Sequence, residues 1–329
     1  MRKGFVGFAT ACFLFVSGCA TPGLRHSTGQ NEHAPSAYPK VLAVYMPWFG
    51  DHSHIDVGYS SEDKGVLRRQ IQQARQRGIS GFVVDWNGER NPYADHNFGL
   101  LEEVANESHF HVALLYNEAQ DDDSQATDDA MAALDEAYKN YIGPRAPGRD
   151  AYLLFQGQPL IFIFPKRGNT DWNRVRQHCA NWESPPLLIY KDQPAPQYAD
   201  AFAGSYAWVQ PGGQGWKADG SNWGLEYLDY FYKSMKKQTS KIAVGAAWPG
   251  FNDSRASWSL NRHMQARCGQ TLDDTMDFYR RYYDDGNPLP FLLIETWNDY
   301  EEGTAIERPD TASCKVHSDQ QANAAANTR

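Results

Sequence analysis

The 329-residue sequence lacks the features that several large classes of protein need. It contains no block rich in Lys and Arg and has a formal net charge of −9, which argues against nucleic acid as a partner because binding to phosphates needs clustered positive charge. It contains no G-x-S-x-G motif, which argues against an esterase or amidase. No glycine-rich phosphate-binding motif follows the first predicted strand, so a dinucleotide cofactor is not expected.

Cysteine is also scarce, with five residues. Neither C-x-x-C nor Cys/His spacing of the kind found in metal sites occurs, and we predict neither a metal nor a cofactor. A loop with His52, His54 and Asp56 is the one alternative metal site, but no second cluster supplies further ligands. Outside the first 19 residues, Cys179, Cys268 and Cys314 allow one disulfide and one free thiol.

The N-terminus has the pattern of an export signal. Arg2 and Lys3 precede an apolar run over residues 4–16, which is too short to span about 30 Å of hydrocarbon. The run ends in Val-Ser-Gly-Cys, which resembles the bacterial lipobox and predicts acylation of Cys19. Ordinary secretory cleavage near Ala20 is the alternative. We therefore expect a lipid-anchored protein of the bacterial cell envelope, with the outer membrane favoured because Ala20 replaces the Asp that retains lipoproteins at the inner membrane.

The remaining chain divides into a tether, a folded body and a tail. We predict a signal peptide over residues 1–18, a flexible tether over 19–39, a catalytic domain over 40–310 and a disordered polar tail over 311–329. Nothing in the sequence requires an oligomer, and we expect a monomer.

Eight short apolar runs with little polar alternation predict strands that are buried on both faces. They are Val41–Tyr45, Gly81–Trp86, Val112–Asn117, Pro159–Phe164, Leu187–Lys191, Phe202–Val209, Lys241–Trp248 and Phe291–Thr296. Helical patterns lie between several of them, at Lys64–Arg77, Asn97–Glu107, Ala126–Tyr141, Trp172–Ala180, Leu225–Lys237 and Leu272–Tyr283. This alternation in about 270 residues predicts a single-domain (β/α)8 TIM barrel. An open doubly wound sheet is the alternative.

Aromatic and polar residues gather where these strands end. In a barrel the active site is built from the residues that follow the strands, and Trp, Tyr and carboxylates together are typical of sugar sites. The predicted substrate-binding residues are Tyr45, Trp48, Asp85, Trp86, Asn87, Tyr116, Glu118, Tyr190, Trp208, Trp248, Trp297 and Asn298. The same strand ends also carry Lys166 and Asp192.

Cleavage of a glycosidic bond needs two carboxyl groups, one protonated and one ionised. Asp299 and Glu302 follow the last predicted strand at a spacing of three residues. If their loop coils like one turn of helix, both side chains lie on the same side of it. We predict that this pair is catalytic and that Glu301 points elsewhere. Glu295 lies inside an apolar strand and is expected to be buried, either in an ion pair or as a residue that supports the side chains of the site.

Three blocks of the sequence resemble glycoside hydrolase family 99, the endo-α-mannosidases. Residues 295–307 resemble the family motif F/W-N-E-W-x-E-G-T-x-I-E, and also the W-N-D-Y-x-E signature of family 71, the α-1,3-glucanases. Residues 45–50 resemble the opening motif Y-x-P-W-Y-G, and residues 78–86 resemble the second strand of family 99. The regions between these blocks carry no assigned resemblance.

The resemblance implies a metal-independent hydrolase of α-linked glycans on a (β/α)8 barrel. It implies a general acid/base role for Glu302. In family 99 the other carboxylate is a Glu that deprotonates the sugar 2-hydroxyl, whereas this chain has the shorter Asp299, as family 71 does. The sugar, its linkage, endo or exo action and the product anomer stay open. A surface lipoprotein that binds glycans without cutting them is the alternative function.

Overall fold

The computed structural model describes residues 39–119, 124–166, 168–213 and 215–308, which belong to one compact unit. The predicted signal peptide, the lipidation site Cys19, nearly all of the tether and the polar tail lie outside the described residues. Of the cysteines, Cys179 is buried with a free thiol and Cys268 is disulfide-bonded. Within the described ranges, no helix combines the length and the apolar character that a membrane span needs.

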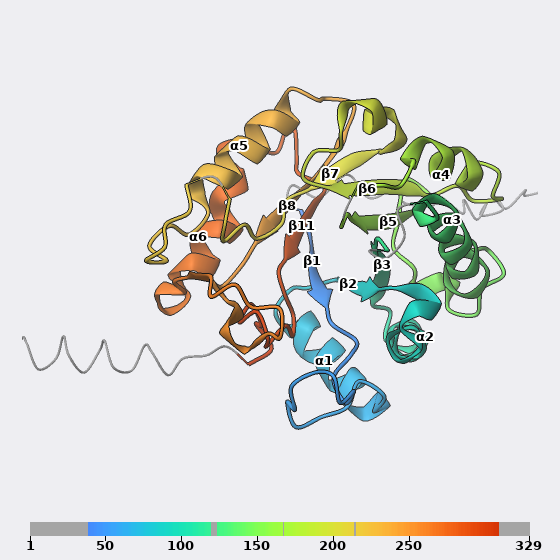
Figure 1. Cartoon of the computed structure of the whole chain (residues 1–329), viewed down its shortest axis with the longest axis horizontal. Helices are drawn as coiled ribbons and strands as arrows, with labels where there is room; N and C mark the ends of the chain where they lie inside the picture. The colour runs from blue at the N-terminus through green and yellow to red at the C-terminus, as the bar shows by residue number, and fades with distance from the viewer. Residues whose placement is uncertain (1–38, 120–123, 167, 214, 309–329) are drawn as a thin grey trace, which may run out of the picture. The chain divides into compact units, whose positions relative to one another are not determined.

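Eight parallel strands close into a barrel, which confirms the predicted (β/α)8 fold (Figure 1). The strand order is β3-β2-β1-β11-β8-β7-β6-β5, and pairing of β3 with β5 closes the ring, so the open doubly wound sheet is wrong. The barrel strands are β1 Lys40–Tyr45, β2 Gly81–Trp86, β3 His111–Asn117, β5 Gln158–Phe164, β6 Leu187–Lys191, β7 Gly204–Tyr206, β8 Ile242–Ala247 and β11 Phe291–Ile294.

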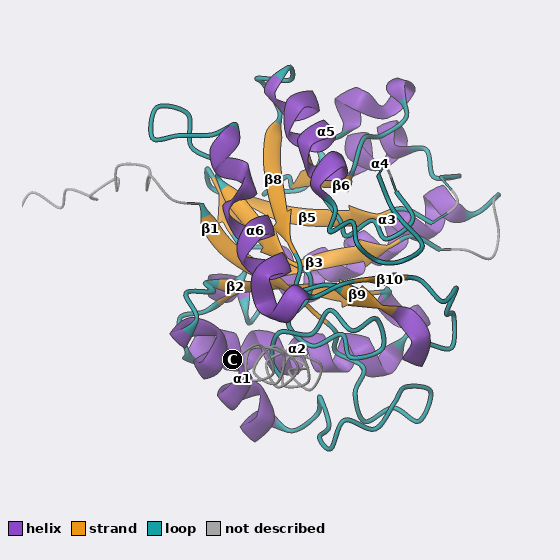
Figure 2. Ribbon diagram, turned by 90° about the vertical axis from the view of Figure 1, so that its left-hand side faces the viewer, coloured by secondary structure: helices purple, strands orange, loops and turns teal. Residues whose placement is uncertain are grey.

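In the part of the chain that the structure describes, six α-helices lie outside the strands (Figure 2). They are α1 Lys64–Gln76, α2 Pro92–Glu107, α3 Ala126–Ala137, α4 Trp172–Cys179, α5 Leu225–Lys236 and α6 Gln270–Phe278. Asp63 and Asp171 cap α1 and α4 by accepting backbone N–H bonds. Helix α2 begins five residues before the predicted Asn97, because Asn91 caps it and Pro92 occupies its first position.

Several short elements complete the described chain. The unit between β6 and β7 has a 3-10 helix in place of an α-helix, and β7 is three residues long, shorter than the predicted run. The other short strands are β4 Leu154–Phe155, β9 Phe251–Asn252 and β10 His263–Met264. The short helices are η1 Gly88–Arg90, η2 Tyr138–Ile142, η3 Arg149–Ala151, η4 Pro196–Ala201, η5 Asp253–Arg255, η6 Arg267–Gly269 and η7 Tyr279–Arg281.

The alternation of side chains along each strand decides what reaches the barrel interior. On β5 and β7, Phe162 packs against Tyr206 with ring centroids 5.5 Å apart, and the Tyr206 hydroxyl donates to the Ile163 carbonyl oxygen. One layer further toward the C-terminal ends, Phe164 packs against Trp208 at 5.0 Å. Aromatic rings therefore fill this part of the barrel up to the level where the strands end.

The close approach of β7 to β8 generates a stability prediction. A Cβ atom added to Gly204 would lie 2.0 Å from the Ile242 carbonyl oxygen, which belongs to the backbone and cannot rotate away. We expect Gly204→Ala to lower the free energy of unfolding by about 1–3 kcal/mol. Gly212→Ala is the matched control, since no atom lies within 4 Å of its added Cβ. Urea denaturation compares them, and equal stability of the two variants would contradict the packing argument.

Candidate active site

A tight turn after β11 holds the two predicted catalytic carboxyl groups at the C-terminal end of the barrel. The Asp299 carbonyl oxygen accepts N–H bonds from Thr304 and Ala305, both 3.1 Å long, and Gly303 adopts a left-handed φ of +64° that closes the turn. The Oδ1 atom of Asp299 accepts the N–H groups of Glu301 and Glu302 at 3.0 and 2.9 Å. The predicted coiling of this loop is therefore present, and the Asp299 side chain is part of it.

Burial perturbs both carboxyl groups of this turn. Asp299 is 2% exposed, and burial together with the nearby charge of Glu302 raises its pKa well above the usual range. Burial also raises the pKa of Glu302. Because two carboxylates in one low-dielectric site resist simultaneous ionisation, the pair retains a proton at a pH where free carboxyl groups have lost theirs.

Glu302 is the more accessible member of the pair. Its side chain is partly exposed, and Oε1 accepts the indole N–H of Trp258 at 3.1 Å. Trp258, 42% exposed, comes from the loop between β9 and β10. The main chain fixes this approach, because the Glu302 carbonyl oxygen accepts the N–H of Asn252 on β9 at 2.7 Å.

Glu301 turns away from this pair, as predicted. Its Oε2 lies 2.9 Å from Nδ1 of His54, whose ring stacks on Trp48 with centroids 4.5 Å apart. Trp258 meets the same histidine edge-on at 6.5 Å. Trp48, His54 and Trp258 thus form an aromatic rim beside the carboxylate turn, the turn that holds Asp299 and Glu302. Among the described residues, no three His, Cys, Asp or Glu side chains form a group able to hold a metal ion.

Asp85 and Glu118 are polar residues of the barrel mouth with different surroundings. Asp85 lies at the end of β2 and accepts the Asn117 amide at 2.5 Å, and burial raises its pKa. Glu118 is 2% exposed and accepts the N–H groups of Lys166, Gly168 and Thr170 as well as the Thr170 hydroxyl. Glu118 therefore shapes the loop after β5 and is not a free sugar ligand.

The predicted aromatic platforms are mostly wrong, since five of the rings are buried. Tyr45, Trp86, Tyr116, Trp248 and Trp297 each expose less than 2% of their surface. The Tyr45 hydroxyl donates to Gln70 of α1, and the indole N–H groups of Trp86 and Trp248 donate to Asp95 and to the Trp223 carbonyl oxygen. These side chains come from strand ends but face the helices, because alternate residues of a strand point outward.

Of the other predicted site residues, some are partly exposed and some are buried. Trp48 and Asn87 are partly exposed, and Trp208 is 8% exposed beside Phe164. Tyr190 packs outward against Phe202 at 4.5 Å.

Asn298 is fully buried, and its side-chain amide bonds both the N–H and the carbonyl oxygen of Met46, at 2.8 and 2.9 Å. It joins the end of β11 to the end of β1 and is not a sugar ligand.

Glu295 is buried as expected but its ion pair is absent from the described residues. Its Oε2 accepts the N–H of Val209, while Oε1 has no hydrogen-bond partner there. Burial raises its pKa well above the usual range, and the nearby Lys191 opposes that rise.

Three side chains at this end of the barrel are absent from the residues predicted from the sequence. Lys191 closes β6, whereas Trp258 and Arg262 lie in the excursion that follows β8. Arg262 pairs with the buried Asp253 at 2.9 Å. Alternation along β6 was the available signal for Lys191, because Tyr190 points outward and its neighbour must point inward. Trp258 lies in no strand end and had no such signal.

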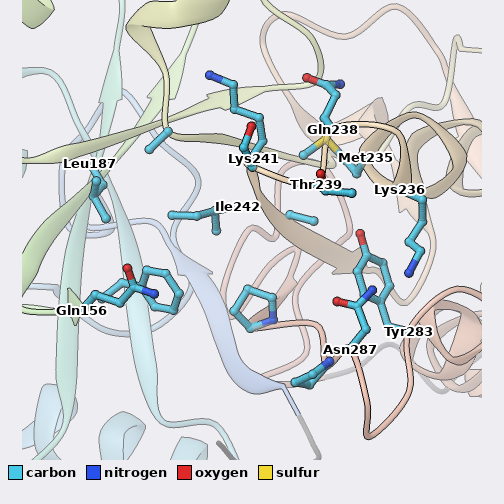
Figure 3. Close-up of a pocket in the computed structure, with 16 residues that line it drawn as sticks. Gln156, Leu187, Met235, Lys236, Gln238, Thr239, Lys241, Ile242, Tyr283 and Asn287 are labelled. Carbon is cyan, nitrogen blue, oxygen red and sulfur yellow. The ribbon is translucent and has the colours of Figure 1, made fainter.

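A pocket of about 430 Å³ lies at the opposite end of the barrel (Figure 3). Lys236, Gln238 and Lys241 line it together with Tyr283, and no carboxylate is among its lining residues. It lacks the acid and base that glycoside hydrolysis needs. The carboxylate turn therefore remains the candidate active site.

Solved structures with the same fold include carbohydrate-active enzymes. Two structures of the GH99 endo-α-mannosidase from Bacteroides thetaiotaomicron match at a TM-score of 0.62 and 19% identity, covering 82–83% of this chain and 87–90% of theirs. A protein described as glycoside hydrolase-like matches at 0.57 and 15% identity, covering 84% of this chain and 88% of its own. No family model matches the sequence, and no curated protein matches it significantly. At these identities the likeness establishes the fold.

The raised pKa of Glu302 predicts how the free energy of unfolding changes with pH. A carboxyl group with a higher pKa in the folded chain holds its proton more tightly there, so stability falls as the pH rises from the unfolded pKa near 4 toward the folded value. Glu302→Gln removes this loss. We expect the stability of the variant relative to wild type, measured by urea denaturation, to increase as the pH rises above the unfolded pKa of about 4.

Glu103→Gln, which changes an exposed carboxylate on α2, is the control for this pH series. A relative stability of Glu302→Gln that stays constant as the pH rises would contradict the assignment of a raised pKa to Glu302.

Proposed function

We propose that the protein is a glycoside hydrolase that cleaves α-linked glycans at the C-terminal end of the barrel. The observation that carries this proposal is the pair of carboxyl groups of Asp299 and Glu302 on one tight turn, with raised pKa values and an aromatic rim beside it. The sequence resemblance to families 99 and 71 and the shared fold support the α-linked class of substrate.

In this proposal Glu302 is the general acid/base. A catalytic acid must be protonated before it acts and must reach the glycosidic oxygen. Glu302 fits both conditions, since burial raises its pKa and its side chain is partly exposed. The Trp258 indole N–H supports the carboxylate that forms once the proton has been transferred, because it donates to Oε1.

We assign Asp299 first to positioning Glu302. Its Oδ1 accepts the two N–H groups of the turn, and burial together with the charge of Glu302 raises its own pKa. Removal of a proton from the sugar 2-hydroxyl, the role that the family resemblance implies, would fall to Oδ2, which accepts neither of these two bonds. Since Asp299 is 2% exposed, this role requires the sugar to bind in direct contact with the turn that contains Asp299.

The alternative function is glycan binding without cleavage. The burial of Asp299 favours this alternative, because a carboxyl group that is 2% exposed offers little surface to a reacting sugar. Both functions share the same mouth of the barrel, and they differ in whether Glu302 transfers a proton.

Glu302→Gln separates the two functions. Incubation of residues 30–329 with a panel of α-mannans, α-glucans and β-linked glycans, with products followed by NMR, should show release from an α-linked glycan. The variant should lose about 10²–10⁴-fold in turnover, as is typical for removal of a general acid, and should still bind the oligosaccharide. Glu103→Gln should keep full turnover. Unchanged release by Glu302→Gln would exclude its acid/base role, and release from β-linked glycans alone would exclude the α-linked class.

We also propose that Cys19 anchors the protein to the bacterial envelope. The lipobox-like sequence carries this proposal, since acyl chains on the cysteine would supply more than one membrane signal. Cys19→Ala should move the protein from the membrane fraction to the soluble fraction. Mass spectrometry of the mature N-terminus distinguishes an acylated Cys19 from ordinary cleavage near Ala20, which would contradict the anchor.

A further inference from the structure

Two lysines converge on one aromatic ring in the mouth of the barrel. Lys191 ends β6 and Lys166 lies two residues beyond β5. Their ammonium groups lie 3.9 and 4.6 Å from the centroid of the Phe164 ring. Register explains the arrangement, because Ile163 pairs with Tyr190 and the next residues, Phe164 and Lys191, lie side by side and point inward.

Neither ammonium group has a charged partner in the part of the chain that the structure describes. The ion pairs there use other lysines and arginines, and no hydrogen bond from either Nζ atom is present. Lys191 is partly buried, and burial lowers its pKa, with Lys166 adding to the effect. Two cations this close to one ring repel each other.

The carboxylates around the lysines already have other donors. Asp192 accepts the Tyr227 hydroxyl and the Gln210 amide, and Asp85 accepts the Asn117 amide. Glu295 accepts the Val209 N–H and Glu302 accepts the Trp258 indole. Their charges act on the lysines from a distance, and none of them lies within the 4.0 Å of an ion pair. The N–H donors of both lysines are therefore free for a ligand.

We propose that Lys166 and Lys191 bind a negatively charged substituent, a uronate carboxylate or a sulfate ester, on the glycan held beside Glu302. The inference rests on the proposed function, since it names the substrate class of the same site. An anion between the two ammonium groups relieves their repulsion and gains charge-assisted hydrogen bonds.

Ligand pairs that differ only in charge test the proposal. Binding of methyl α-glucuronide is compared with methyl α-glucoside, and methyl α-mannoside 6-sulfate with methyl α-mannoside, by NMR titration. The charged member of at least one pair should bind about tenfold more tightly, or more, as expected for hydrogen bonds to a charged group. The pair that shows the preference distinguishes carboxylate from sulfate.

Variants of the two lysines test whether they cause the preference for the charged ligand. Lys191→Met and Lys166→Met should each abolish most of it, and Lys166 is exposed, so its variant remains informative if Lys191→Met fails to fold. Lys236→Met is the matched control, because its ammonium group also lies over a ring, Tyr283 at 5.0 Å, but at the opposite end of the barrel (Figure 3). It should keep the preference.

Equal binding of charged and neutral ligands by the wild type, or a preference that survives in both mouth variants, would overturn the proposal. Hydrolysis of neutral α-glycans without any such preference would refute the lysine site alone and leave the proposed function standing. A preference that depends on the lysines, in a protein that cleaves no glycan, would support the lysine site and refute the hydrolase.

Discussion

The candidate site depends on the hydrogen bonds that join the end of the last barrel strand to the end of the first. The buried amide of Asn298 bonds both backbone groups of Met46, and the Trp297 N–H donates to the Val44 carbonyl oxygen at 2.7 Å. These bonds continue the pairing of β1 with β11 beyond the point where both strands end. Because the turn with Asp299 and Glu302 follows at once, the seam that closes the barrel also fixes the carboxylate pair.

The same turn shows how the fold accommodates buried carboxylates. An isolated buried charge is costly, and the cost falls when N–H groups donate to it. Glu118 receives three backbone N–H groups and a hydroxyl, and it serves the loop after β5. Asp299 receives two N–H groups through one oxygen. Glu302 receives a single indole N–H and keeps partial contact with solvent. Proton transfer suits the group with the fewest fixed donors, since its protonation disturbs the fewest bonds.

The strands were predictable from sequence because a barrel strand is buried on both faces and appears as a continuous apolar run. The same property explains why most predicted aromatic platforms are buried: a strand that is apolar on both faces does not reveal whether the side chain at its end points into the barrel or toward the helices. Alternation would have corrected part of the prediction: Asp85 and Asn117 point inward, whereas their neighbours Trp86 and Tyr116 point outward. Trp258 was beyond prediction, because it meets Glu302 from 44 positions away along an irregular loop.

The negative net charge argues against a nucleic acid partner, but it does not decide whether the barrel mouth binds a smaller anion. A polyanion contacts many positions at once, so its binding depends on the charge of a wide surface. Charges more than about 10 Å apart, in contrast, are largely screened at physiological salt. A single carboxylate or sulfate senses mainly its nearest neighbours. In the mouth these are two ammonium groups without ion pairs among the described residues, beside carboxylates that other donors already engage. An acidic chain can therefore present a local cationic subsite, and partial burial strengthens that subsite because fewer water molecules and salt ions reach it.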